Sequence, residues 1–433
     1  MNKPKGLFHL NIRRPKFTGK RLVKIASDAT SKTISAQTKN VSITLASSSD
    51  FNKDSDDYTK AFDEADGIVF EGFRVAIVNE NREEQVTMLT DSSKSKNTFI
   101  YSEPERYVYA LIDDLEIFKQ KIQSAVRRSG NEPVKARSPH SKSGYFRDDD
   151  IASWGIHAVN VLNSKFTGKG VNVAILDTGF NLSHPDFAGR VVNSKSFISG
   201  QEVDDQNGHG SHCTGISAGN INKTTKRRYG VAKEANIFIG KVLSNAGSGS
   251  DSGILAGMEW AIANNCKVIS MSLGAPVEQG EAYSNIYNDI AKKAMSKGTL
   301  IIAAAGNESR RDQGMVNPVG HPANCPAIMA VAALDRTLNV AYFSCGGINP
   351  DGGQVDIAAP GVEVYSSWKS PGNYNIISGT SMATPCVAGI AALFNEAYPE
   401  ATASDIWMYI TQNALRLDLN SSDVGAGLVQ PPK

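Results

Sequence analysis

The second part of the chain carries long apolar runs of the kind that form buried strands. Residues 171–176 and 300–305 are each continuous and apolar, which is typical of a parallel sheet covered on both faces. Residues 381–394 have the pattern of a helix, and Pro385 lies in its predicted first turn, where the missing N–H costs nothing. Together these elements predict an α/β fold.

The first part of the chain has a different pattern. Short segments of strand-forming residues precede an amphipathic stretch, so we expect strands at 41–45, 67–70, 73–78 and 107–112 and a helix at 115–122. Three parts are therefore predicted: a small α+β domain over residues 1–127, an exposed polar linker over 128–147 and the α/β domain over 148–433.

Candidate chemistry starts at Ser381, in the sequence Gly-Thr-Ser-Met-Ala-Thr-Pro at residues 379–385. This serine follows a glycine turn and opens the predicted helix, so free backbone N–H groups and the positive end of the helix dipole face its hydroxyl. An isolated serine in such a position more often caps the helix without any chemistry. Residues upstream decide between these interpretations.

Three further polar residues stand at the ends of predicted elements. Asp177 closes the strand at 171–176, Asn307 follows the strand at 300–305, and His209 lies between glycines that leave its imidazole unobstructed. A hydroxyl, a neutral imidazole and an orienting carboxylate are the components of nucleophilic acyl transfer, and an amide can stabilise the oxyanion. Each signal alone favours a turn or a cap. In the order Asp, His, Asn, Ser they predict a hydrolytic site.

From residue 154 to residue 427 the chain resembles the subtilisin-like serine proteases, the subtilases. The motifs that carry this resemblance lie at residues 177–179, 209–212, 272–274, 304–307 and 379–385. The resemblance implies a mostly parallel twisted sheet with helices on both faces, preceded here by the smaller α+β domain. It implies that Ser381 forms an acyl-enzyme, with His209 transferring the proton, Asp177 orienting His209, and Asn307 and the Ser381 N–H holding the oxyanion. No cofactor is required for this chemistry.

The resemblance also implies a cleft that binds an extended polypeptide as an added strand. Its two walls are expected at Gly247, Ser248 and Gly249 and at Ser272, Leu273 and Gly274. The S1 pocket, which takes the residue whose carbonyl is attacked (P1), is expected between the second wall and Ala304, Ala305 and Gly306, with Gly320 at its floor. A glycine floor leaves room and supplies no charge, so a large apolar or aromatic P1 residue is expected.

Other residues are assigned by the same resemblance. Asp251 and Ile254 are expected at the rim of the pocket for the fourth residue (P4), where Asp251 either favours a basic side chain or is simply solvated. Cys213, beside the catalytic imidazole, resembles the thiol-containing branch that includes proteinase K, and it is not expected to be the nucleophile. His212 is expected to be a packed structural residue.

Two sets of residues resemble calcium ligands of the family. Asp186 and Asn222 form the first, although the loop at 220–228 carries four basic residues that weaken a dication site. The second set joins Asp356 to the carbonyls of Pro326 and Ile328, with a turn cap as the alternative role of Asp356. Structural calcium is therefore a candidate without a role in catalysis.

Composition bears on partners and compartment. The formal net charge is +1 over 433 residues, so electrostatics favour neither nucleic acid nor a membrane as partner. Five cysteines, an odd number without paired spacing, argue against a disulfide framework and give no zinc signature. Neither a signal-peptide core nor a membrane span is visible, so a cytoplasmic monomer is expected, with export by an unrecognised route as the alternative.

The resemblance predicts a zymogen, in which the N-terminal domain assists folding, occupies the cleft and is removed by self-cleavage. Cleavage is expected beside Tyr145 and Phe146, at the end of the linker. The segregation of basic residues in 1–39 from acidic residues in 50–66 favours solvated faces over an interaction surface. Two alternatives are a dedicated maturation protease that recognises one protein through residues 1–127 and an inactive subtilase scaffold that binds peptides.

Overall fold

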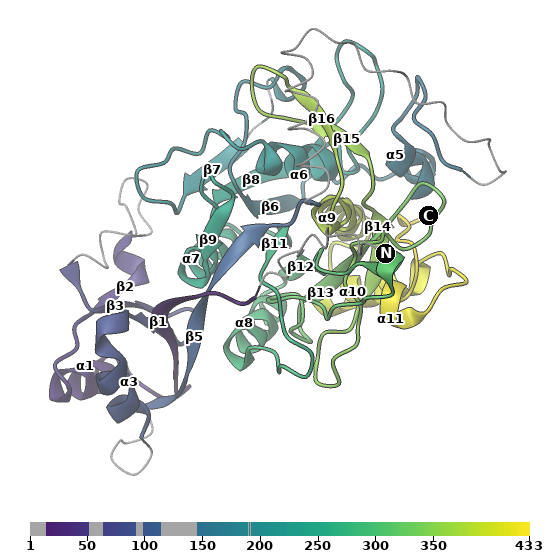
Figure 1. Ribbon diagram of the computed structural model, residues 1–433. Helices are drawn as coiled ribbons and strands as arrows, with labels where there is room; N and C mark the ends of the chain where they lie inside the picture. The colour runs from purple at the N-terminus through teal and green to yellow at the C-terminus, as the bar shows by residue number, and fades with distance from the viewer. Residues whose placement is uncertain (1–13, 52–63, 92–97, 114–144, 189, 191) are drawn as a thin grey trace, which may run out of the picture.

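The computed structural model describes residues 14–51, 64–91, 98–113, 145–188, 190 and 192–433. Within these ranges the chain forms a large α/β domain and a smaller N-terminal domain that lies against its helices α7 (Asp251–Ala263) and α8 (Asn285–Ser296) (Figure 1).

In the described part of the chain, seven parallel strands form the centre of the large domain. In spatial order they are β14 (Ile357–Pro360), β13 (Met329–Leu334), β12 (Leu300–Ala304), β10 (Val268–Met271), β6 (Asn172–Asp177), β8 (Asn236–Lys241) and β7 (Val192–Ser196). Strands such as β12 and β13 are apolar and buried along their whole length, because helices cover both faces of the sheet.

The helices place the site at one edge of this sheet. The longest, α9 (Thr380–Ala397), packs on β10, β12 and β13 and against α6 (His209–Ala218). On the sheet, α7 packs against β6 and β8, and α8 against β12. Further elements of the large domain include α5 (Trp154–Ala158), α10 (Ala403–Asn413), α11 (Ser421–Val424) and the hairpin of β15 (Val364–Ser367) and β16 (Tyr374–Ile377).

The N-terminal domain is a strongly twisted sheet with helices on one face. Its elements are β1 (Phe17–Ile25), α1 (Ser31–Asn40), β2 (Leu45–Ser47), β3 (Gly67–Phe70), β4 (Val75–Val78), α3 (Glu83–Thr90) and β5 (Phe99–Ala110), and the strand order is β5-β1-β4-β3-β2. Because successive side chains of a strand point to opposite faces, Val23 packs with α1 and α3 while its neighbour Leu22 joins the core of the large domain. The domain therefore has two apolar faces, one covered by its own helices and one by the large domain.

Two carboxylates of β5 hold the domains together. Glu103 accepts hydrogen bonds from the Ser284 hydroxyl and from the backbone N–H groups of Asn285 and Ile286, at the start of α8. Glu105 accepts from the Ser252 N–H (2.9 Å), at the start of α7, and is fully buried. Negative charge at a helix N-terminus is favourable because it satisfies free N–H groups and meets the positive end of the dipole.

The predicted elements of the N-terminal part are confirmed unevenly. The strand at 67–70 is confirmed as β3, and those at 73–78 and 107–112 correspond to β4 and to the end of the longer β5. The strand at 41–45 is wrong, because residues 41–44 form a turn and β2 begins at Leu45. The basic stretch before residue 25 contains β1, which the sequence reasoning missed. The predicted helix at 115–122 and most of the linker lie outside the described residues.

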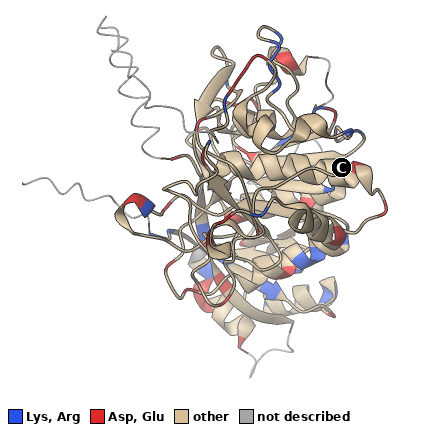
Figure 2. Ribbon diagram, turned by 90° about the vertical axis from the view of Figure 1, so that its right-hand side faces the viewer, with Lys and Arg blue, Asp and Glu red and all other residues tan. Residues whose placement is uncertain are grey.

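Charged residues of both signs are interspersed over the face shown in Figure 2, which fits the near-zero net charge. Among the described residues, no helix has the length and apolarity to cross a bilayer.

Candidate active site

The four polar residues predicted to form the site converge at one edge of the parallel sheet. Asp177 is the last residue of β6, His209 the first of α6 and Ser381 the second of α9, while Asn307 follows β12. This edge is formed by the carboxyl ends of adjacent strands, where open α/β sheets bind their ligands. Four residues that lie between 32 and 204 positions apart in the chain are thereby brought together.

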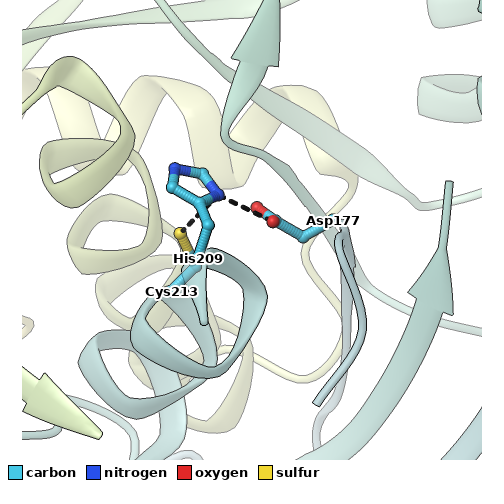
Figure 3. A group of neighbouring side chains, drawn as sticks. All are labelled: Asp177, His209 and Cys213. Atoms are coloured by element: carbon cyan, nitrogen blue, oxygen red, sulfur yellow. Dashed lines mark hydrogen bonds and ion pairs between the residues drawn. The ribbon is translucent and has the colours of Figure 1, made fainter. Parts of the chain in front are cut away.

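Asp177 and His209 form a buried pair (Figure 3). The His209 Nδ1 lies 2.7 Å from the Asp177 Oδ1, which also accepts the Thr178 N–H at 2.7 Å. A carboxylate at Nδ1 fixes the tautomer in which Nδ1–H donates and Nε2 is a free base. Among the described residues nothing hydrogen-bonds to His209 Nε2, so this nitrogen remains available to accept a proton.

The Ser381 hydroxyl hydrogen-bonds to the main chain of Ser272 and of Leu111, which follows β5. Its Oγ donates to the Ser272 carbonyl (2.9 Å) and accepts the Leu111 N–H (3.2 Å). Transfer of its proton to His209 therefore requires the hydroxyl to leave the Ser272 carbonyl.

Pro385 lies deeper in the helix than the sequence suggested. Because α9 begins at Thr380, Pro385 is beyond the first turn, and its missing N–H leaves the Ser381 carbonyl without its helical donor. Two side chains take that place: the Ser272 hydroxyl donates at 2.8 Å and the Cys213 thiol at 3.5 Å. The prediction that Pro385 lies in the first turn was wrong. Because of this proline, the Ser381 carbonyl is bound by the side chains of Ser272 and Cys213 and not by a helical N–H.

The Asn307 side chain, the candidate oxyanion donor, contacts the Leu111 carbonyl. Its Nδ2 donates to the Leu111 carbonyl oxygen at 2.7 Å. Its Oδ1 accepts from the Thr380 N–H (3.0 Å) and the Thr380 hydroxyl (2.8 Å), so the carboxamide cannot turn. A preoriented amide of this kind stabilises negative charge on the carbonyl oxygen.

The end of β5 occupies the cleft as an added strand. It pairs antiparallel with β9 (Ser248–Ser250) on one side and with β11 (Leu273–Gly274) on the other, and the Ala110 N–H donates to the Gly247 carbonyl at 2.9 Å. Beyond the site, the Asp113 N–H donates to Ser378, and its carboxylate accepts from the Tyr342 hydroxyl. The intact Leu111–Ile112 bond is therefore held across Ser381.

The expected cleavage position beside Tyr145 and Phe146 does not occupy the cleft in this conformation. Tyr145 is exposed, and the Phe146 N–H donates to the carbonyl of Arg336. Neither of these contacts involves β9 or β11, the strands that line the cleft. Main-chain pairing placed a different segment in the cleft, and such pairing leaves no side-chain motif in the sequence.

One of the predicted S1 segments contacts the Leu111 side chain. A Cβ at Gly274 would lie 3.2 Å from the Leu111 Cδ1, and the Gly320 N–H donates to the Ala305 carbonyl, which joins the floor to the Ala304–Gly306 wall. Gly306 has a φ of +117°, a conformation that favours glycine. Leu111 is buried, as an apolar residue in an apolar pocket should be.

Asp251 differs from its predicted role. Both carboxylate oxygens are engaged, one by the Arg106 N–H (2.8 Å) and the other by His321 Nε2 (3.1 Å). The residue at the P4 position is the buried Val108, and Ile254 is buried in α7. Asp251 is 2% exposed and contacts the backbone of the bound strand, so its carboxylate is neither solvated nor paired with a basic P4 side chain in this structure.

Cys213 and His212 match their expected passive roles. Burial raises the pKa of the Cys213 thiol well above its ordinary value, with a further contribution from Asp177, so the sulfur is not ionised. Burial lowers the pKa of His212 to about 3, and its Nε2 lies 3.1 Å from the Val364 carbonyl. Asp177, His209 and Cys213 offer three potential metal-ligating atoms, but the first two are already paired with each other.

Sequence reasoning missed the residues that support the triad. Asp205 accepts from the Thr178 hydroxyl (2.9 Å), from the Gly208 N–H (2.8 Å) and from Ser211, while the Thr178 hydroxyl accepts from Gly210. These bonds tie the end of β6 to the start of α6. The second of two adjacent aspartates, four residues before His209, was the available signal, and by itself it indicates only a turn.

Comparison with known proteins agrees with this geometry. A sequence model of the subtilase family matches residues 168–427. The chain belongs to the subtilase family. It is 38% identical over 275 residues to subtilisin DY of Bacillus licheniformis, and this alignment covers 63% of this chain and 94% of the relative. It is 40% identical over 280 residues to a thermostable alkaline protease of Halalkalibacterium halodurans (64% and 71%) and 35% over 320 residues to subtilisin E of Bacillus subtilis (71% and 79%).

Membership makes the chain a subtilisin-like serine endopeptidase, which excludes the inactive scaffold. It also overturns the expected cytoplasmic location, because the subtilisin relatives are secreted extracellular proteases. The resemblance of Cys213 to the proteinase K branch stays a prediction.

The residues of this subtilase at the first predicted calcium position do not fit a cation. The Asp186 carboxylate accepts the Lys223 N–H (2.9 Å) and the hydroxyls of Tyr229 (2.8 Å) and Tyr374 (3.0 Å). The Asn222 Oδ1 accepts the N–H groups of the two residues at 224 and 225. Donors therefore surround the oxygens that calcium would need.

The second predicted calcium position rests on Asp356 alone. One of its oxygens accepts the Ala330 N–H at 2.7 Å, and burial raises its pKa to about 7. The contact fits the alternative role of a backbone cap. No described contact involves the carbonyl of Pro326 or Ile328 with this carboxylate, so the second ligand set stays a prediction.

We expect Asp186→Asn to lower the free energy of unfolding by about 1–3 kcal/mol, because a buried carboxylate that accepts two phenols is replaced by an amide with two donors of its own. The loss should be the same in excess EDTA and in calcium, as measured by denaturant unfolding in a Ser381→Ala background that prevents autolysis. Tyr374→Phe, which removes one of the phenols, should cause a smaller loss. A loss seen only with calcium present would instead indicate a cation at Asp186.

Proposed function

We propose that this serine endopeptidase is a zymogen that cuts its own Leu111–Ile112 bond and prefers a large apolar P1 residue. One observation carries the proposal: the Leu111 carbonyl oxygen lies 2.7 Å from Asn307 Nδ2 while the strand that precedes it pairs on both sides. Its position is that of a peptide substrate, and it belongs to the chain's own N-terminal domain.

The proposed chemistry uses the groups at the sheet edge. Ser381 Oγ attacks the Leu111 carbonyl carbon as His209 Nε2 takes the hydroxyl proton. Negative charge on the carbonyl oxygen is held by Asn307 Nδ2 and the Ser381 N–H. The tetrahedral intermediate collapses, His209 gives the proton to the Ile112 nitrogen, and the peptide after Leu111 leaves. Water, deprotonated by His209, then attacks the acyl carbon and releases Leu111 as a carboxylate.

The N-terminal domain would remain as an inhibitor after this cut. The pairing of β5 with β9 and β11 and the two helix-capping carboxylates do not involve the broken bond. A cleaved strand with these contacts is a slowly leaving product, which supports an inhibitory role for residues before 112.

Timed expression followed by N-terminal sequencing tests this proposal. The first new N-terminus should be Ile112, and Leu111→Glu should slow its appearance at least tenfold, because a charge would enter an apolar pocket. Leu111→Phe should still be processed, and Tyr145→Glu serves as a matched control that changes nothing. A first cut beside Tyr145 or Phe146, or undiminished processing of Leu111→Glu, would exclude Leu111 as the P1 residue.

A further inference from the structure

The strand in the cleft, β5, carries a positively charged side chain just before the residues that pair with β9 and β11. Arg106 lies five residues before Leu111, and its Nη2 is 2.6 Å from the Glu281 Oε1 of the large domain. The side chains of Arg106 and Glu281 are 11% and 27% exposed. The pair therefore crosses between the two domains in a partly desolvated position, where charge pairing is worth more than at an open surface.

Glu281 is held in place by the large domain itself. Its second oxygen, Oε2, accepts the Glu278 N–H at 2.9 Å. The turn between them is tied to Asn349, whose Nδ2 donates to the carbonyls of Glu278 and Glu281 and whose Oδ1 accepts the Gly280 N–H. Because none of these bonds involves the N-terminal domain, the carboxylate stays oriented when that domain leaves.

The main chain at Arg106 is also fixed by the large domain. Beyond Tyr107, the last residue paired with β9, the Arg106 N–H donates to Asp251 Oδ2, and His321 holds the other oxygen of Asp251. Asp251 and His321 are each 2% exposed. A bound chain is thus kept in register up to the residue whose side chain reaches Glu281.

We propose that Glu281, aligned by Asp251, forms a subsite for an arginine or lysine side chain five residues before P1 in polypeptide substrates. The inference rests on the proposed function, because it takes β5 as the guide to how substrates lie. An uncharged side chain at that position leaves the Glu281 carboxylate without its cation, and an acidic one repels it. One contact is not transferred to substrates: the Arg106 guanidinium stacks 5.7 Å from the ring of Phe17, which belongs to the N-terminal domain. The selectivity expected of the free subsite is therefore modest.

Two quenched fluorescent peptides test the subsite on the activated enzyme. Both carry the chain's own sequence Tyr-Val-Tyr-Ala-Leu-Ile-Asp, preceded in one by arginine and in the other by citrulline, which has nearly the same shape without the charge. The wild type should cleave the arginine peptide with a kcat/KM about three- to tenfold higher, consistent with a partly exposed ion pair. The preference should decline in high salt.

Matched variants test whether Glu281 causes the preference for the arginine peptide. Glu281→Gln should reduce the preference to about one by lowering the kcat/KM of the arginine peptide, and an unfolding midpoint equal to that of the wild type would report intact folding. Glu278→Gln, an exposed glutamate three residues away, should keep the wild-type preference. Equal cleavage of both peptides by the wild type, or a preference that survives Glu281→Gln, overturns the subsite alone. Cleavage of neither peptide overturns the proposed function and the subsite with it.

Discussion

Replacing Ser381 with alanine is expected to lower kcat for peptide hydrolysis by about 10⁶-fold and to leave the full-length chain uncut. The substitution removes the oxygen that forms the acyl-enzyme, and the rest of the site retains only binding and oxyanion stabilisation. The packing of α9 should be unaffected, because within the described part of the chain the Ser381 hydroxyl hydrogen-bonds only to the Ser272 carbonyl and the Leu111 N–H. Peptide assays and gel analysis of the purified variant measure both effects.

A rival nucleophile provides the control. The Cys213 sulfur lies 3.9 Å from His209 Nδ1, so a thiol stands beside the same imidazole as the serine. Burial keeps that thiol protonated by raising its pKa, so Cys213→Ala should retain activity within about tenfold. A fluorophosphonate reagent should label the wild type and Cys213→Ala but not Ser381→Ala. Labelling or processing that persists in Ser381→Ala would show that another group attacks the peptide.

Three of the candidate catalytic residues could be predicted because each stands at the end of a strongly patterned element. Buried parallel strands read as continuous apolar runs, and their carboxyl ends meet at one edge, so Asp177 and Asn307 were placed by the pattern of β6 and β12. The glycine before α9 gave the position of Ser381 in the same way. Local sequence was sufficient to place these residues, because their reactive side chains lie at the ends of elements that the apolar pattern predicts.

The content of the cleft could not be predicted, because strand addition depends on the main chain. Nothing in the side chains of residues 107–112 distinguishes a strand that pairs within its own domain from one that also pairs with β9 and β11. Glu103 and Glu105 had the charge of a solvated face, yet they cap helices that begin 146 or more residues later in the chain. Their role depends on how two domains meet, which periodicity does not encode.

The calcium expectation at Asp186 shows a different limit of reasoning from local sequence. The position of this residue resembled a calcium ligand, and the sequence reasoning weighed only the basic residues of the loop at 220–228 against it. The decisive groups are phenols: Tyr229 and Tyr374 come from distant segments and fill the space around the carboxylate. Satisfaction of a buried acid by hydrogen-bond donors is a tertiary property, so a ligand pattern in one segment does not establish a cation site.

The second large effect is expected at the oxyanion donor, where Asn307→Leu keeps the approximate shape of the side chain and removes its N–H. We expect kcat to fall by about 10²–10³-fold, or roughly 3–4 kcal/mol of transition-state stabilisation. Asn307 Nδ2 already touches the Leu111 carbonyl in the bound state, so KM should rise as well, but by much less. The larger share falls on kcat because the bond strengthens as the oxygen becomes charged.

The two contacts of the Asn307 Oδ1 allow this interpretation to be checked. Thr380 donates to it through both its N–H and its hydroxyl, and only the second is lost in Thr380→Val. That variant keeps the donor and loosens its aim, so its kcat should lie between those of the wild type and Asn307→Leu. Thr380→Ser restores a hydroxyl and should recover most of the activity. If Asn307→Leu changed KM and kcat equally, the amide would be binding the peptide without any preference for the transition state, and charge stabilisation would have to come from the backbone N–H at the start of α9.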